Sequence, residues 1–320
     1  HTALRRQPQM CIRDSYDSRM RARTAGVEQM SIEDVVIIDI DNTSVGPIEE
    51  GGLGRYHNWP HAYHGELINT VSSGNPKALL FDVIFDEENT YKYDLVRALS
   101  SASNNRSNDL SEATNQFLYS NDPGKFVSAT ANSKQTYHAI VFEEEDTLNF
   151  LPKMLSEPEG YEFANHIIRG VSDEAKTKLP QADRIGNTYV DLLSASTGNG
   201  SANFPQDNDG VIRRAPTAIY FDGADHVYPS LVMSAVIDIL GIKKDGGFDY
   251  DFENNLLNLI DSTDTIVRTI PIDDNGRMYV NYFGKFQTFY YLPYSYCMDP
   301  EMLPPCLLYT SDAADEVQCV

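Results

Sequence analysis

The sequence predicts an α/β fold: a central mixed sheet with a parallel βαβ core, flanked by helices and extended by antiparallel strands in the second half. Two observations support this prediction. Residues 35–41 and 78–85 are short apolar runs, and a helical pattern lies between them. From residue 211 onward, strand patterns alternate with tight-turn dipeptides such as Asn-Gly and Asp-Gly, which are typical of antiparallel pairing.

The first half supplies the parallel core. Residues 35–41 are rich in β-branched side chains and indicate a buried strand that ends in carboxylates. Residues 64–73 carry apolar side chains at helical spacing, and a Gly-Asn-Pro sequence stops the helix. A strand, a helix and a strand within about 50 residues predict that residues 35–41 pair in parallel with residues 78–85. Residues 137–142 are predicted to add a third strand.

The stretch before this third strand is less regular. Residues 91–102 are predicted to form a helix, and residues 103–133 a mobile surface insertion. Ser, Asn and Asp dominate the insertion, and few large apolar side chains are available to hold it against a core.

The second half predicts strands at residues 211–221 and 278–283, with a helix at residues 229–240 between them. Gly241 ends this helix. One broad apolar face is expected on it, formed by Leu231, Val232, Ala235, Val236, Ile239 and Leu240. No Pro-rich or Gly/Ser-rich linker separates the halves, so residues 30–300 are predicted to form a single domain.

The two ends of the chain have a different character. Residues 1–15 and 306–320 resemble translated sequencing-adapter read-through, and a disordered tail is the alternative. In both cases these ends are expected to make no packed contacts. The natural gene is expected to continue beyond them.

Composition excludes several classes of function. The chain has 320 residues and a net charge of -22, which repels phosphate backbones and anionic lipid headgroups. Nucleic acid is therefore not an expected partner. The four cysteines lie near the ends without metal-site spacing, and neither a cofactor nor a metal is predicted.

The order of several motifs resembles the CHASE2 domain family. That pattern begins with a strand ending in acidic residues and a nearby Ser, matched by Asp39, Asp41 and Ser44. A Trp-Pro pair follows at Trp59, where many members next show an Arg and this chain has His61. A Phe-Asp-x-x-Phe strand is matched at residues 81–85.

Three further motifs continue the resemblance through the second half. The pattern Asp-x-Asp-Gly followed by two apolar residues and Arg-Arg-x-Pro is matched at residues 207–216. A Pro-Ser-Leu helix start is matched at residues 229–231, and an apolar-Pro-apolar-Asp-x-x-Gly-Arg segment at residues 270–277. The set covers roughly residues 33–295; the main departures are His61 and the Asn/Ser-rich insertion.

The resemblance implies an extracytoplasmic, periplasmic sensor of an inner-membrane receptor. Such a sensor is flanked by transmembrane helices and followed by a cytoplasmic cyclase or kinase, so this region itself is not expected to be an enzyme. It implies an unknown small ligand or extracytoplasmic partner, leaves room for a homodimer, and involves the membrane only through the flanking helices.

The ligand-binding candidates are Asp39, Asp41, Ser44, Trp59, His61, Asp82, Asp86, Arg213 and Arg214. The acidic ones follow predicted parallel strands, where open α/β sheets bind ligands. The alternative is that these carboxylates cap helices or accept backbone hydrogen bonds. For Trp59 the alternative to stacking on a ligand is anchoring a loop to the core.

The basic and imidazole side chains also have structural alternatives. Arg213 and Arg214 should point to opposite faces of a strand, with the inward one pairing with a buried carboxylate or binding an anion. His57, His61 and His64 are close in sequence. A solvated, histidine-rich loop is favoured over a metal site there, because Pro60 interrupts a continuous helix.

The runner-up function is a Mg²⁺-dependent haloacid-dehalogenase-like phosphatase. Residues 37–43 resemble the first motif of that family, in which Asp39 would be the nucleophile and Asp41 the general acid/base. A second acidic pair at Asp273 and Asp274 could complete a metal site. That pair precedes Asn-Gly, the signature of a hairpin rather than of a buried parallel strand, so no catalytic residue is predicted.

Overall fold

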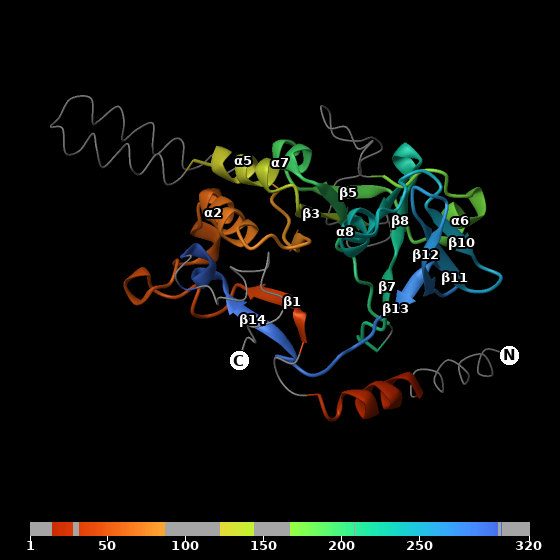
Figure 1. Ribbon diagram of the computed structural model, residues 1–320, viewed down its shortest axis with the longest axis horizontal. Helices are drawn as coiled ribbons and strands as arrows, with labels where there is room; N and C mark the ends of the chain where they lie inside the picture. Colours follow the sequence, from red (N-terminus) through yellow and green to blue (C-terminus); the bar gives the residue numbers. More distant parts are fainter. Residues whose placement is uncertain are drawn as a thin grey trace. The chain divides into compact units, whose positions relative to one another are not determined.

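The computed structural model describes residues 15–27, 32–86, 122–143, 167–207, 209–299 and 302. The chain divides into two compact units, residues 1–57 with 280–302 and residues 58–279 with 303–320, which are described separately. The mixed sheets and helices confirm the α/β class (Figure 1). The predicted helix at residues 91–102 and nearly all of the two predicted tails lie outside the described residues. The single-domain boundaries stay a prediction.

The first unit is built around two parallel strands. β1 (Ile32–Asp39) confirms the predicted first strand, and it pairs in parallel with β14 (Phe289–Pro293). The predicted pairing of this strand with residues 78–85 was therefore wrong. Apolar patterning shows that a segment is a strand, but it carries no information on which distant segment completes the backbone hydrogen bonds. The sequence signal that we missed is the run of aromatic residues in β14, which favours a strand.

Short elements complete the first unit. Residues 15–24 are helical, and the Tyr16 hydroxyl donates a hydrogen bond to the carbonyl of Val280. The 3₁₀ turns η1 (Ile48–Glu50) and η2 (Tyr56–Asn58) follow β1 in the chain, and η5 (Tyr294–Met298) follows β14.

The central sheet of the second unit contains the parallel core. β3 (Thr136–Glu143) pairs in parallel with β2 (Leu79–Phe81) and with β6 (Gly198–Ser201), and antiparallel with β5 (Arg184–Asn187). The predicted strand at residues 137–142 is thus confirmed. Burial along β3 is almost continuous, as expected for a strand covered on both faces.

Helices α2 (His61–Ser72) and α5 (Gly124–Ser133) pack against each other in the second unit (Figure 1). Gly65 allows this close approach, because a Cβ there would lie 2.8 Å from the backbone oxygen of Lys125. The predicted mobile insertion was wrong over residues 124–133, since Phe126 and Ala129 bury one face of α5 in the core. Residues 103–121 lie outside the described residues.

Antiparallel pairing dominates the second half, as predicted. Its sheets pair β8 with β9, β11 with both β10 and β12, and β7 with β13, while β4 lies parallel to β8. The elements are α6 (Asp173–Lys178), β4 (Gln181–Ala182), α7 (Val190–Ala195), β7 (Arg214–Pro216), β8 (Ala218–Phe221), η4 (Asp222–Ala224), β9 (His226–Pro229), β10 (Phe248–Asp251), β11 (Leu256–Ile260), β12 (Ile266–Pro271) and β13 (Arg277–Tyr279).

Two predicted strands were too long. Residues 211–221 form two strands, β7 and β8, which change pairing partner at Thr217. The Thr217 hydroxyl donates a 2.6 Å hydrogen bond to the carbonyl of Gly276, which draws this point toward the turn before β13. The strand predicted at residues 278–283 ends at Tyr279.

Helix α8 (Leu231–Leu240) confirms the predicted helix and its end. The Ser230 side chain caps its N-terminus, and Gly241 ends it in the left-handed conformation (φ 64°). The predicted apolar face was partly wrong. Met233 and Ile237 are buried against β10 and β11, whereas Val232 and Ile239 are each 44% exposed. An almost wholly apolar helix does not specify which of its faces the core covers.

Candidate functional site: a buried histidine and aromatic cluster

The predicted acidic candidates fall into separate units. Asp39, Asp41 and Ser44 belong to the first unit, and Asp82 and Asp86 to the second. Asp82 and Asp86 follow β2 with exposed side chains. Among the residues that the structure describes, no group of three or more His, Cys, Asp or Glu side chains is placed to hold a metal ion. Ligand binding by these carboxylates stays a prediction.

In the first unit, Asp41 stabilises a turn. Its Oδ1 accepts a 2.8 Å hydrogen bond from the backbone N–H of Ser44, and the buried Ser44 Oγ accepts one from the N–H of Ser295 at 3.0 Å. Partial burial raises the pKa of Asp41, but hydrogen bonds from Ser44 and Thr43 outweigh burial, so its pKa lies below the usual value. This is the structural alternative foreseen for these carboxylates.

The two adjacent arginines belong to an arginine–aspartate cluster in the second unit, formed by Asp207, Asp209, Arg213, Arg214, Asp273 and Arg277. The Arg213 guanidinium makes a bidentate contact with Asp209, at 2.9 Å for each nitrogen, and a 3.1 Å hydrogen bond with Asp207. The side chains of Arg213 and Asp207 are only 4% and 7% exposed. Arg213 is therefore the inward arginine, paired with a buried carboxylate.

The predicted opposite orientation of the two arginines was wrong. Nη1 of Arg214 lies 3.9 Å from Asp207 and 3.7 Å from Asp273, so both arginines face Asp207. Strand β7 begins only at Arg214, and side-chain alternation does not extend to Arg213 before it. Anion binding by either arginine stays a prediction.

A denser group of chemically active side chains lies elsewhere in the second unit. We call it the histidine–aromatic cluster, and its members are Trp59, His61, His64, Phe81, Phe85, Phe126, His138 and Tyr189. Pro60 precedes the first residue of α2, so His61 and His64, three residues apart, lie on one face of that helix. His138 comes from β3 and Phe126 from α5.

Ring contacts hold the cluster together. His138 stacks on Phe81 with centroids 4.9 Å apart and an interplanar angle of 17°, and His61 stacks on Tyr189 at 5.8 Å and 4°. The ring of His64 meets Phe85 edge-on at 4.8 Å. Aromatic pairs at such distances add stabilisation beyond the burial of their surface area.

The three imidazoles are held close to one another. The rings of His61 and His64 are 6.1 Å apart, and both are buried. The predicted solvated loop was therefore wrong for these two residues, while His57 is exposed in the first unit. Pro60 is the N-cap residue just before α2, where its missing N–H breaks no helical hydrogen bond, so it does not interrupt the helix.

Burial keeps the imidazoles of His64 and His138 neutral. It lowers the pKa of His64 to about 3, with the neighbouring His61 and His138 as further causes. Burial alone lowers the pKa of His138 to about 3. Within the part of the chain that the structure describes, neither ring nitrogen of His138 has a hydrogen-bond partner. A buried polar side chain in this state calls for an explanation.

Trp59 is almost completely buried, and its ring lies 6.5 Å from those of Tyr63 and His64. It anchors the start of α2 to the core, the structural role foreseen for it. Sequence reasoning missed His64 and His138 as site residues. The available signals were the i,i+3 spacing of His61 and His64 and the polar His138 within an apolar strand.

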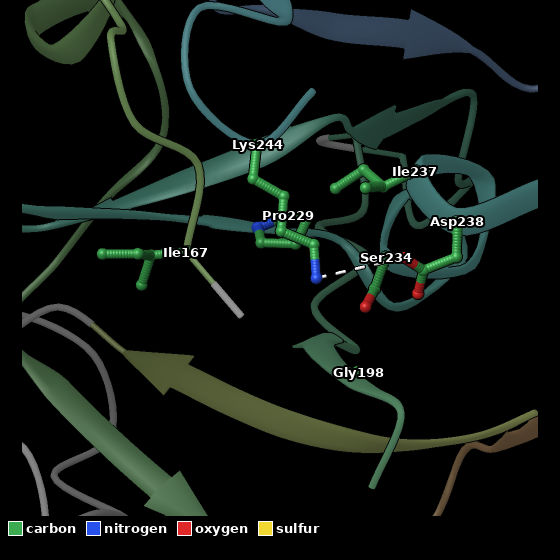
Figure 2. A pocket seen from close by; sticks show the side chains of 7 residues that line it. All are labelled: Ile167, Gly198, Pro229, Ser234, Ile237, Asp238 and Lys244. Carbon is green, nitrogen blue, oxygen red and sulfur yellow. Dashed lines mark ion pairs between the residues drawn. The ribbon is translucent and has the colours of Figure 1, made fainter. Parts of the chain in front are cut away.

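A small pocket lies near α8 in the second unit (Figure 2). Its volume is about 10 Å³, which is room for a single water molecule. In Figure 2, Lys244 extends toward Asp238, with Nζ and Oδ1 3.9 Å apart. Asp238 also accepts a 3.0 Å hydrogen bond from the Tyr137 hydroxyl. The pocket is too small for an organic ligand.

The sequence model of the CHASE2 domain family matches residues 3–315 of this chain. Because the match covers nearly the whole sequence, the chain belongs to the CHASE2 domain family. This is a family of extracellular sensory domains of receptor cyclases and kinases, and the domain itself is not catalytic. No curated protein and no solved structure matches the chain. No helix among the described residues is long and apolar enough to span a bilayer.

Proposed function

We propose that this chain is the extracytoplasmic sensing part of a membrane-bound signalling receptor, whose remaining parts are transmembrane helices and a cytoplasmic cyclase or kinase. The observation that carries the proposal is the family match over residues 3–315. On this proposal, the chain lies on the periplasmic side of the inner membrane in a bacterial cell. The stimulus is a small ligand or another extracytoplasmic signal, and a homodimer is the proposed state for passing it on.

Asp41, the general acid/base of the alternative phosphatase, has a structural role in the first unit. A general acid needs a pKa near the working pH. The Asp41 carboxylate accepts hydrogen bonds that lower its pKa, and it is engaged in a turn with Ser44. Such a carboxylate stays ionised and acts as a hydrogen-bond acceptor for the backbone N–H.

The receptor role can be tested with a chimera. The chain replaces the sensor of a CHASE2-containing receptor adenylate cyclase, between its first transmembrane helix and the next, and cyclic AMP is measured while extracytoplasmic conditions are varied. The sensor proposal predicts output that follows these conditions. A matched chimera with a destabilised core, Phe126→Ala, should lose the response. A correctly inserted chimera with constant output would contradict the proposal.

The alternative is tested by Mg²⁺-dependent hydrolysis of a panel of phosphate esters, with Asp39→Asn as the control variant. A phosphatase would lose its nucleophile in this variant, and turnover would fall by several orders of magnitude. The sensor proposal expects no turnover that depends on Asp39. Hydrolysis that disappears in Asp39→Asn, with thermal stability retained, would establish the phosphatase.

A further inference from the structure

The first unit contains an aromatic segment that has no acidic residue, in a chain whose net charge is -22. Residues 280–298 include neither Asp nor Glu, and Lys285 is their only charged side chain. Aromatic residues make up 11% of the whole chain but are far more frequent in this segment. They are Tyr282, Phe283, Phe286, Phe289, Tyr290, Tyr291, Tyr294 and Tyr296.

The first part of this segment, residues 280–288, is the loop that leads into β14 (Figure 1), and we call it the aromatic loop. Phe286 is 68% exposed and Phe283 41%. The Thr288 hydroxyl donates a 2.7 Å hydrogen bond to the carbonyl of Lys285, which fixes the turn with Phe286 at its tip. Rings held in water in this way mark a contact surface.

Basic side chains lie beside these rings. The helical residues 15–24 belong to the same unit, and the Arg23 guanidinium donates a hydrogen bond to the aromatic loop. The central carbon of this guanidinium lies 6.0 Å from the ring centroid of Phe283. Arg19 is one turn earlier on the same face of the helix. Arg19, Arg23 and Lys285 are all exposed.

The local charge differs from that of the whole chain. Residues 15–27, 280–298 and the start of β1, residues 32–36, carry four cations and three carboxylates, namely Arg19, Arg21, Arg23, Lys285, Asp17, Glu33 and Asp34. Their balance is slightly positive, whereas the chain as a whole has a charge of -22. This region therefore does not repel anionic headgroups as the rest of the chain does.

We propose that the aromatic loop is a membrane-contact surface, which places Phe283 and Phe286 in the headgroup region of a phospholipid bilayer. Aromatic rings are favoured at that depth, where the surroundings are apolar on one side and wet on the other. Arg19, Arg23 and Lys285 then face the lipid phosphates, and this attraction adds to the burial of apolar area.

The choice of a bilayer as the partner rests on the proposed function. In that proposal the transmembrane helices are attached before β1 and after β14, and both strands belong to the first unit. A short tether supplies an effective concentration of about a millimolar, so a weak affinity for the surface is sufficient. A second copy is a poorer partner, because it would bring the same cations and the same net charge against the loop.

Tryptophan fluorescence of the whole chain tests the contact. Phe286→Trp places an indole at the tip of the turn, while the buried Trp59 contributes a constant background. Vesicles of phosphatidylcholine and phosphatidylglycerol with brominated acyl chains are added to about 10 mM lipid, above the concentration that a tether supplies. Phe204→Trp, at an exposed ring of the second unit, is the matched control.

The emission of Phe286→Trp should shift to the blue and be quenched by the bromine atoms, and that of Phe204→Trp should not change. No response of Phe286→Trp up to this lipid concentration would overturn the proposal. An equal response of both variants would overturn it as well, because the contact would then not be specific to the loop.

Sedimentation with vesicles measures the contribution of single side chains. Phe286→Ser should weaken partitioning about tenfold, because it removes the most exposed ring of the loop. Lys285→Gln should weaken it about fivefold on vesicles with phosphatidylglycerol and little on pure phosphatidylcholine. Phe204→Ser should bind as the unmodified chain does. A loss in Phe286→Ser no larger than that in Phe204→Ser would contradict the proposal.

Two other occupants of the loop would give different results. A second copy would appear in light scattering as a dimer that Phe286→Ser disperses, with no effect of vesicles on Phe286→Trp. Cover by another part of the chain would give Phe286→Trp a blue-shifted emission before lipid is added, which vesicles leave unchanged. Either result would overturn the membrane contact.

The cyclase chimera separates this inference from the receptor function. Vesicle contact by the loop, together with a constant output of the chimera, would count against the sensor function and leave the membrane contact in place. A responsive chimera, together with a loop that does not contact vesicles, would overturn the membrane contact and leave the sensor function intact.

Discussion

The second unit buries ionisable side chains in two ways, and the histidine–aromatic cluster and the arginine–aspartate cluster show the contrast. In the arginine–aspartate cluster, the buried charge of Arg213 meets Asp207 and Asp209 at hydrogen-bond distance. In the histidine–aromatic cluster, His64 and His138 are surrounded by phenylalanine rings and stay neutral.

This contrast indicates which of the two clusters should respond to a change in pH. A charge compensated by a bidentate partner is a fixed structural feature, because removing either partner leaves the other buried and unpaired. A neutral imidazole in an apolar cluster is stable only while protons are scarce. The same extent of burial therefore produces rigidity in one region and sensitivity to pH in the other.

The largest expected effect comes from removing packing in the histidine–aromatic cluster. Phe126→Ala deletes a fully buried ring that touches His64, Phe81, Phe85 and His138, and should lower the free energy of unfolding by about 4 kcal/mol. Urea denaturation followed by the fluorescence of Trp59 measures it. Phe204→Ala, at an exposed ring, is the matched control and should change little. Equal losses would show that the cluster has no special role in stability.

The next effect breaks the compensated charge. Arg213→Ala leaves Asp207 buried without its strongest partner and should cost about 3 kcal/mol. The double variant with Asp207→Asn should recover part of this loss, because the uncompensated carboxylate is then gone. Asp209→Ala should cost less, since that side chain is 43% exposed. A double-mutant cycle with no coupling would show that the pair contributes nothing specific.

The pH dependence of stability distinguishes the two regions directly. Between pH 7.5 and 5.5 the free energy of unfolding should fall by roughly 3 kcal/mol, because His64 and His138 each lose about 1.4 kcal/mol over the one pH unit below the unfolded-state pKa of about 6.5. His138→Phe should remove about half of this fall, whereas Arg213→Ala should leave it in place. An unchanged slope in His138→Phe would mean that its imidazole is not held neutral by the fold.

The smallest effect sharpens the view of the arginine–aspartate cluster. Arg214 is 23% exposed and lies 3.7 Å and 3.9 Å from its two carboxylates, so Arg214→Ala should cost roughly 0.5 to 1 kcal/mol. Thermal melting of Arg214→Ala and of Arg213→Ala compares what the two adjacent arginines contribute to stability. A loss as large as that of Arg213→Ala would show that the carboxylates are shared equally.

The sequence by itself determined the α/β class, the resemblance to the family, and the helices and strands that carry dense apolar patterns. Residues 32–39, 136–143 and 231–240 carry dense apolar patterns, and such patterns specify a local conformation regardless of the partner. The cap at Ser230 and the end at Gly241 were likewise readable from residue type.

Only the tertiary structure decided which segments meet. It paired β1 with β14, turned residues 124–133 into a packed helix, and brought His138 near His64 from more than 70 residues away in sequence. Strand pairing and side-chain clustering depend on contacts between distant segments, which local periodicity does not encode. The burial that keeps His64 and His138 neutral is a result of this packing; the sequence signals place His64 on a helix face and His138 within an apolar strand, but they do not bring the two together.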